Sequence, residues 1–204
     1  MMLIVPFVVV FALLLAFNLP RFYERAKASV VLSCDETEKM ANAARTSPFL
    51  AVVLLSGGVL PAWLITHNPF FSLFVLLLGS AAYIDCITKW VPDVLVFALS
   101  WSALCAVLPN ESDVLPALAG ATTMLVPVLT LNLITTLRAQ PPALALGDLY
   151  VLPALGVWLT PNSAAVCLVI SLPLAMLAGK YVRDVPFITV LYPVFMGVSL
   201  CGGW

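Results

Sequence analysis

Two aspartates, Asp85 and Asp148, lie in segments that are otherwise almost entirely apolar. An ionised carboxylate in the hydrocarbon of a membrane costs at least ~2.5 kcal/mol, so such residues usually face the interior of a helix bundle and serve a function. Two carboxyl groups at close range tend to hold one shared proton. One can then act as general base on a water molecule, while the other hydrogen-bonds the scissile carbonyl. The residue types are consistent with hydrolysis, with a proton or ion pathway, and with buried structural polarity.

Other catalytic chemistries lack the residues that they need. The chain has one histidine, His67, and the topology described below places it on the opposite side from both aspartates, which excludes a Ser-His-Asp or Cys-His arrangement. The five cysteines form no CxxC pair, and no phosphate-binding GxxxxGK[ST] loop is present. The nine Lys and Arg residues are too scattered to follow a nucleic acid. We therefore expect no metal, no cofactor and no nucleic-acid partner.

The elements that must position the two carboxylates are membrane-spanning helices. Hydrophobic residues make up 63% of the 204 residues and charged residues 9%, which places the chain outside the soluble globular class. A spanning helix needs about 20 mostly apolar residues. We expect an all-α, polytopic bundle in the lipid bilayer with its N-terminus outside and a retained first helix. The expected spans are 3–19, 48–66, 70–87, 92–108, 115–137, 143–160, 163–179 and 186–203.

The basic residues support this number of spans. With eight spans, all nine Lys and Arg fall in loops on one side, as the positive-inside rule predicts for the cytosol. The same topology places Asp85 about one turn before the end of the third span and Asp148 about one turn into the sixth. The two carboxylates are therefore predicted to lie at one depth, near the cytosolic face.

The chain is predicted to have three parts: a first helix at 1–19, a cytosolic connector at 20–47, and a seven-helix membrane core at 48–204. The connector holds five basic and four acidic residues, and Ser33 could cap a short interfacial helix within it. In the core, the small residues at 79–82 would let another helix approach closely.

Three further residues near the carboxylates have simpler explanations. Gly147 leaves room for a substrate backbone beside Asp148. Pro92 and Asp93 fit the start of the fourth span, where proline suits the first turn and a carboxylate complements the helix dipole. Asp184 lies beside a basic residue in a loop and is expected to be solvated or paired.

Three blocks of the sequence resemble the type IV prepilin peptidases, which are GxGD-type intramembrane aspartic proteases. In residues 85–93, Asp85 is followed eight residues later by Asp93, which is the second residue of the pair Pro92-Asp93. Residues 145–150, AlaLeuGlyAspLeuTyr, resemble the block GxGDxK, and residues 185–193 carry a Pro-Phe pair that opens the last helix. The resemblance covers roughly residues 50–204.

The resemblance implies that Asp85 and Asp148 are catalytic and that Gly147, Pro92 and Asp93 support the motif. It implies cleavage of a short basic leader peptide from a prepilin or pseudopilin, at the cytosolic face of a bacterial inner membrane. Presenilin-like enzymes are another GxGD class, but their ProAlaLeu motif comes later than the one at 153–155 here. A small proton-coupled carrier that uses both carboxylates as a relay remains the non-enzymatic alternative.

The sequence departs from the family pattern in two ways. Ala145 and Tyr150 stand where the second block has its first glycine and its lysine, which could alter substrate fit. Bifunctional members also carry a larger cytosolic domain with paired cysteines between the first two helices. Here that region is only residues 20–47, with one cysteine, so we expect a stand-alone peptidase without N-methyltransferase activity.

Overall fold

The computed structural model describes residues 4–30, 46–89, 91–108, 114–140, 144–181 and 185–202, with the backbone alone at 23–30 and at 146. Most of the predicted connector, its cap at Ser33, and Asp184 therefore lie outside the described residues. Within the described residues the chain forms eight α-helices. They are α1 (Ile4–Val30), α2 (Pro48–Thr66), α3 (Pro69–Thr88), α4 (Asp93–Val107), α5 (Val114–Leu137), α6 (Leu146–Gly156), α7 (Pro161–Gly179) and α8 (Phe187–Cys201).

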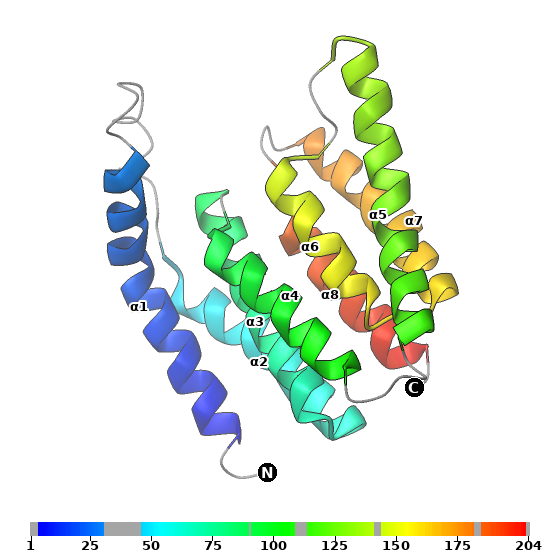
Figure 1. Cartoon of the computed structure of the whole chain (residues 1–204). Helices are drawn as coiled ribbons and strands as arrows, with labels where there is room; N and C mark the ends of the chain where they lie inside the picture. Colours follow the sequence, from blue (N-terminus) through cyan, green and yellow to red (C-terminus); the bar gives the residue numbers. More distant parts are fainter. Residues whose placement is uncertain are drawn as a thin grey trace.

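Each predicted span corresponds to one of these helices, and the described residues form no strand, so the predicted all-α bundle is confirmed. Successive helices run in alternating directions, and both termini lie at the same end of the bundle (Figure 1). Five helices, α1, α2, α3, α5 and α7, are long and apolar enough to cross a membrane, whereas α4 and α8 are shorter apolar helices of 15 residues each.

Two helices differ most in length from the predicted spans. The first helix continues to Val30, with Pro20 inside it, although its apolar part ends at Phe22. Helix α6 has only 11 residues, which corresponds to a length of about 16 Å. Beyond Gly156 the chain continues in tighter turns, in which the amides of Trp158 and Leu159 donate to carbonyls three residues earlier.

Local sequence signals explain where several helices begin and end. Ser47 and Asn68 accept hydrogen bonds from amides in the first turns of α2 and α3, and each of these helices starts with a proline. Helices α2 and α3 end at His67 and Lys89, whose φ angles of 51° and 56° lie in the left-handed region. A residue in this conformation stops the helical hydrogen-bond pattern and turns the chain.

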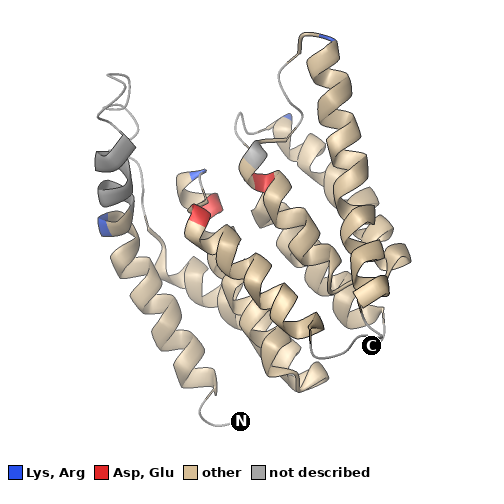
Figure 2. Cartoon of the chain, in the orientation of Figure 1, with Lys and Arg blue, Asp and Glu red and all other residues tan. Residues whose placement is uncertain are grey.

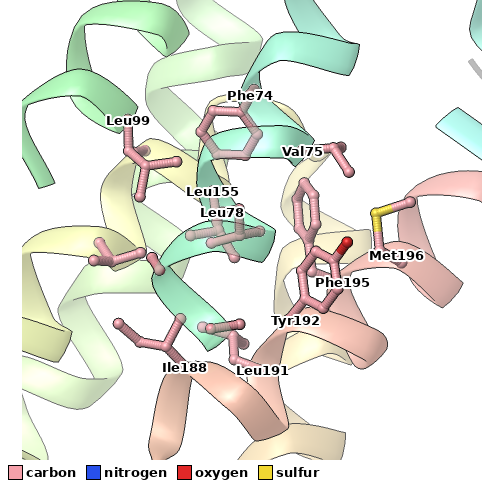
Figure 3. Close-up of a cluster of buried hydrophobic side chains, with 14 of the residues drawn as sticks. Phe74, Val75, Leu78, Leu99, Leu155, Ile188, Leu191, Tyr192, Phe195 and Met196 are labelled. Carbon is pink, nitrogen blue, oxygen red and sulfur yellow. The ribbon is translucent and has the colours of Figure 1, made fainter. Parts of the chain in front are cut away.

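Helix α3 is the most enclosed of the long helices and contacts α1, α2, α4 and α8. Of its membrane span 72% is buried, against 22–28% in the other four. The described hydrophobic core surrounds α3 and joins it to α4, α6 and α8 (Figure 3). Its labelled members in Figure 3 are Phe74, Val75, Leu78, Leu99, Leu155, Ile188, Leu191, Tyr192, Phe195 and Met196.

Glycines allow the closest helix contacts. Tyr192 of α8 lies against Gly58 of α2 and Gly79 of α3, and its hydroxyl donates a 2.9 Å hydrogen bond to the Leu54 carbonyl. A Cβ at Gly58 would overlap the tyrosine hydroxyl. The predicted close approach of a helix to the small residues beginning at position 79 is thus observed, and the approaching helix is α8.

The described charged residues all lie towards one end of the bundle (Figure 2). They include the basic residues at the ends of α3, α5 and α7 and the acidic residues of α3, α4 and α6. The chain termini lie at the other end (Figures 1 and 2). This distribution places the two aspartates singled out in the sequence at the same end of the helices.

Candidate active site

Asp85 lies in the last turn of α3 and is almost fully enclosed, with 5% of its surface exposed. Its helix is held on several sides by neighbours, so the side chain has a fixed environment. The next turn ends at Lys89, whose amide donates to the Asp85 carbonyl and closes the helix. The structure therefore presents Asp85 on a rigid element close to the charged end of the bundle.

The Asp85 carboxylate accepts hydrogen bonds from the start of α8. The backbone amide of Thr189 lies 3.2 Å from Asp85 Oδ2, and the Thr189 hydroxyl lies 3.4 Å from the same oxygen. The hydroxyl also donates a 2.8 Å hydrogen bond to the Ala82 carbonyl of α3. The sequence analysis did not identify Thr189. The Pro-Phe pair at the start of the last helix marked the correct segment, but no local signal linked it to a side chain 104 residues earlier.

Asp148 lies in the first turn of α6 and is half-buried. The segment before α6 is held by Asn132 of α5, which forms two hydrogen bonds with the backbone of Leu144. The Asn132 side-chain amide donates to the Leu144 carbonyl at 3.1 Å, and its Oδ1 accepts from the Leu144 amide at 3.0 Å. Sequence reasoning also missed Asn132, because an asparagine in the polar end of a helix has no distinctive spacing.

The structure brings Asp85 and Asp148 close enough for the charge on one to act on the other. The helices that carry them are joined through two common neighbours, since both α4 and α8 contact α3 and α6. Two carboxyl groups in this relation can hold one proton between them and can activate a water molecule. The fold thus brings two residues that are 63 positions apart in the sequence to the same end of the bundle.

The structure separates the remaining predicted residues according to their surroundings. Gly147 is exposed, and among the described residues beyond its own helix no atom would lie within 4 Å of a Cβ added there, which leaves open space beside Asp148. Pro92 is the N-cap of α4, and Asp93 is its exposed first residue, as expected for a helix start. His67 precedes α3 and is therefore at the opposite end of this helix from Asp85.

Comparison with known protein families gives one match. The family model described as the type IV leader peptidase family matches residues 72–200, which is more than half of the chain. The chain belongs to the type IV leader peptidase family. Searches of curated proteins and of solved structures gave no match. The resemblance stated from the three sequence blocks is thus confirmed, and all three blocks fall within the matched residues.

Membership of this peptidase family makes the protein a protease, and the apolar helices make it a membrane protein. The carrier alternative therefore does not hold. The two positions at which this leader peptidase departs from the family pattern, Ala145 and Tyr150, are both exposed, and they flank Gly147 and Asp148 in the chain. Neither side chain is part of the buried core.

Proposed function

We propose that this leader peptidase is an aspartic endopeptidase in which Asp85 and Asp148 activate a water molecule. The proposal rests on the position of these two carboxyl groups at one end of the bundle, near enough for the charge of Asp85 to act on Asp148, in a chain of a peptidase family. One carboxylate takes a proton from the water as its oxygen attacks the scissile carbonyl carbon. The other carboxyl group hydrogen-bonds the carbonyl oxygen and stabilises the charge that develops on it.

The tetrahedral intermediate then collapses by breaking the carbon–nitrogen bond. The leaving nitrogen receives the proton that the base took from the water, and the dyad returns to its singly protonated state. Pro92 and Asp93 support this site by starting α4, which contacts both carboxylate-bearing helices. The reaction forms no covalent enzyme intermediate.

The substrate that we propose is a type IV prepilin or pseudopilin, cleaved after its short basic leader at the cytosolic face of the bacterial inner membrane. Three features support this choice. The dyad lies at the end of the bundle where the described basic residues gather (Figure 2), which the positive-inside rule assigns to the cytosol. A dyad at this end of the bundle suits a substrate whose apolar helix stays in the bilayer while its leader lies in water. The family to which the chain belongs is named for leader peptidases.

The experiment is co-expression of the full chain with a prepilin, followed by measurement of leader removal. We expect Asp85→Asn and Asp148→Asn each to lower the cleavage rate at least ~100-fold, because each removes a general acid–base group. Thr122→Val is the control, since the exposed Thr122 hydroxyl donates to the Ala119 carbonyl of its own helix, α5. It should remain within about 2-fold of the unmodified chain. Undiminished cleavage by both of the first two variants would refute the dyad.

We also propose that the protein does not methylate the processed N-terminus. Its sequence between the first two helices has one cysteine in place of the paired cysteines of bifunctional members. Purified protein incubated with processed pilin and labelled S-adenosylmethionine should transfer no label. Incorporation of label into the pilin N-terminus would contradict this proposal.

A further inference from the structure

The two carboxyl groups of the site have different surroundings. Asp85 faces the first turn of α8, where the backbone amide of Thr189 donates a 3.2 Å hydrogen bond to its carboxylate. The first amides of a helix have no partner within the helix, and they carry the positive end of its dipole. Hydrogen bonds of this kind favour the ionised form of a carboxyl group. No hydrogen bond from the described residues reaches the carboxylate of Asp148.

The Thr189 hydroxyl holds the Thr189 amide in place. It has one proton, and of its two possible acceptors the Ala82 carbonyl is closer, at 2.8 Å, than Asp85 Oδ2, at 3.4 Å. The hydroxyl therefore donates to Ala82, which lies one turn before Asp85 on the same face of α3. This bond ties the start of α8 to α3 beside Asp85 and directs the Thr189 amide at the carboxylate.

We propose that Thr189 is a positioning residue that keeps Asp85 as the ionised member of the dyad, so that Asp85 is the general base and Asp148 carries the proton. The inference rests on the proposed function, because it assigns the two roles that the dyad mechanism leaves open. In the first step the water proton passes to Asp85 as the water oxygen bonds to the carbonyl carbon. The Asp148 hydroxyl donates to the carbonyl oxygen. Asp85 then passes its proton to the leaving nitrogen as the carbon–nitrogen bond breaks.

The charged groups around Asp85 are few, so a change at Thr189 can be interpreted. Lys89 follows Asp85 on α3, Asp148 faces it from α6, and Asp93 opens α4. Helices α2 and α8 contain no Lys, Arg, Asp or Glu. Arg21 is the charged side chain that the structure describes on α1. None of these groups is altered by replacement of Thr189.

The first test measures leader cleavage against pH for Thr189→Val and Thr189→Ser. Loss of one neutral hydrogen bond should lower kcat roughly 3- to 10-fold in Thr189→Val. The acid-side half-maximum of its pH profile should move to higher pH, because Asp85 loses support for its ionised form. Thr189→Ser keeps the hydroxyl and should recover most of the rate and the original profile. Thr123→Val is the matched control, because the Thr123 hydroxyl bonds to a carbonyl of its own helix, α5.

A structural role for Thr189 would lower the rate at every pH by one factor, and an unshifted profile in Thr189→Val would therefore overturn the proposal. Equal loss in Thr189→Ser and Thr189→Val would overturn it too, since the hydroxyl would then not be the group that matters.

The second test needs neither activity nor a change at Thr189. The infrared carbonyl band of a protonated carboxyl group can be followed against pH in Asp148→Asn, which leaves Asp85, and in Asp85→Asn, which leaves Asp148. Asp85 should become protonated at a lower pH than Asp148. The reverse order would overturn the assignment even if the peptidase activity is as proposed. If Asp85 becomes protonated at a lower pH than Asp148 but the unmodified chain cleaves no prepilin, the proposed function is refuted and the assignment of the two carboxyl groups stands.

Discussion

Replacement of Gly147 by alanine separates a role in substrate binding from a role in folding. Gly147 is the second residue of α6 and precedes Asp148, and an added Cβ would meet no atom within 4 Å among the described residues beyond its chain neighbours and its own helix. Alanine is also a better helix former than glycine, by up to about 1 kcal/mol inside a helix. The free energy of unfolding should therefore stay the same or rise slightly.

The effect on activity should be much larger than the effect on stability. The open space at Gly147 is beside a proposed catalytic carboxylate, and we expect the substrate backbone to pass through it, so that an added methyl group would collide with the substrate. One methyl group in a closely fitting site changes binding by about 1–3 kcal/mol, which corresponds to a roughly 10- to 200-fold loss in kcat/KM. We expect most of this loss in KM, since the Asp85 and Asp148 carboxyl groups are unchanged.

The assay combines cleavage kinetics on a prepilin with thermal unfolding in detergent. Gly57→Ala in α2 is the matched control, because a Cβ at Gly57 also meets no atom within 4 Å, and that site is remote from the carboxylates. Gly57→Ala should leave kcat/KM unchanged and should not lower the unfolding temperature. The reasoning is refuted if Gly147→Ala cleaves as fast as the unmodified chain, or if it unfolds at a clearly lower temperature, because either result means that the space is not kept for substrate.

Two other predictions concern contacts that position the site. Gly58→Ala should lower the free energy of unfolding by about 1–3 kcal/mol, because the added Cβ would overlap Tyr192. Gly57→Ala, one residue earlier, should not lower it. Equal thermal unfolding of the two variants would contradict the packing of α8 on α2. Asn132→Leu should lower the free energy of unfolding by about 1–3 kcal/mol, because it removes both hydrogen bonds to Leu144. It should also lower kcat, because these bonds hold the segment before α6. Unchanged cleavage and unchanged unfolding would show that the two hydrogen bonds are dispensable.

Ala145 and Tyr150, the two residues that depart from the family pattern, are both exposed. Tyr150 is 61% exposed on α6, and Ala145 is the exposed N-cap of that helix. Both positions are therefore free to vary without disturbing the core. Their closeness in sequence to Asp148 suits a contribution to the choice of leader sequence rather than to the chemistry.

The sequence alone determined the number of helices, most of their ends, and the two carboxylates that merit a functional explanation. These properties are local. Hydropathy over about 20 residues, proline and capping residues at helix starts, and the cost of a charge in an apolar span can all be read without knowing what lies nearby. For this reason the predicted spans and the eight observed helices agree closely, and Asp85 and Asp148 were found before the fold was known.

Only the tertiary structure decided which groups surround those carboxylates. The hydrogen bonds from Thr189 to Asp85 and from Asn132 to Leu144 join segments 104 and 12 residues apart, and no hydropathy pattern marks either of them. The physical reason is that lipid is as apolar as a bundle interior, so an amphipathic stripe does not reveal which face of a membrane helix is enclosed. Helix α3 is apolar along its length like its neighbours, yet the packing alone makes it the central helix and gives Asp85 and Asp148 their unequal surroundings.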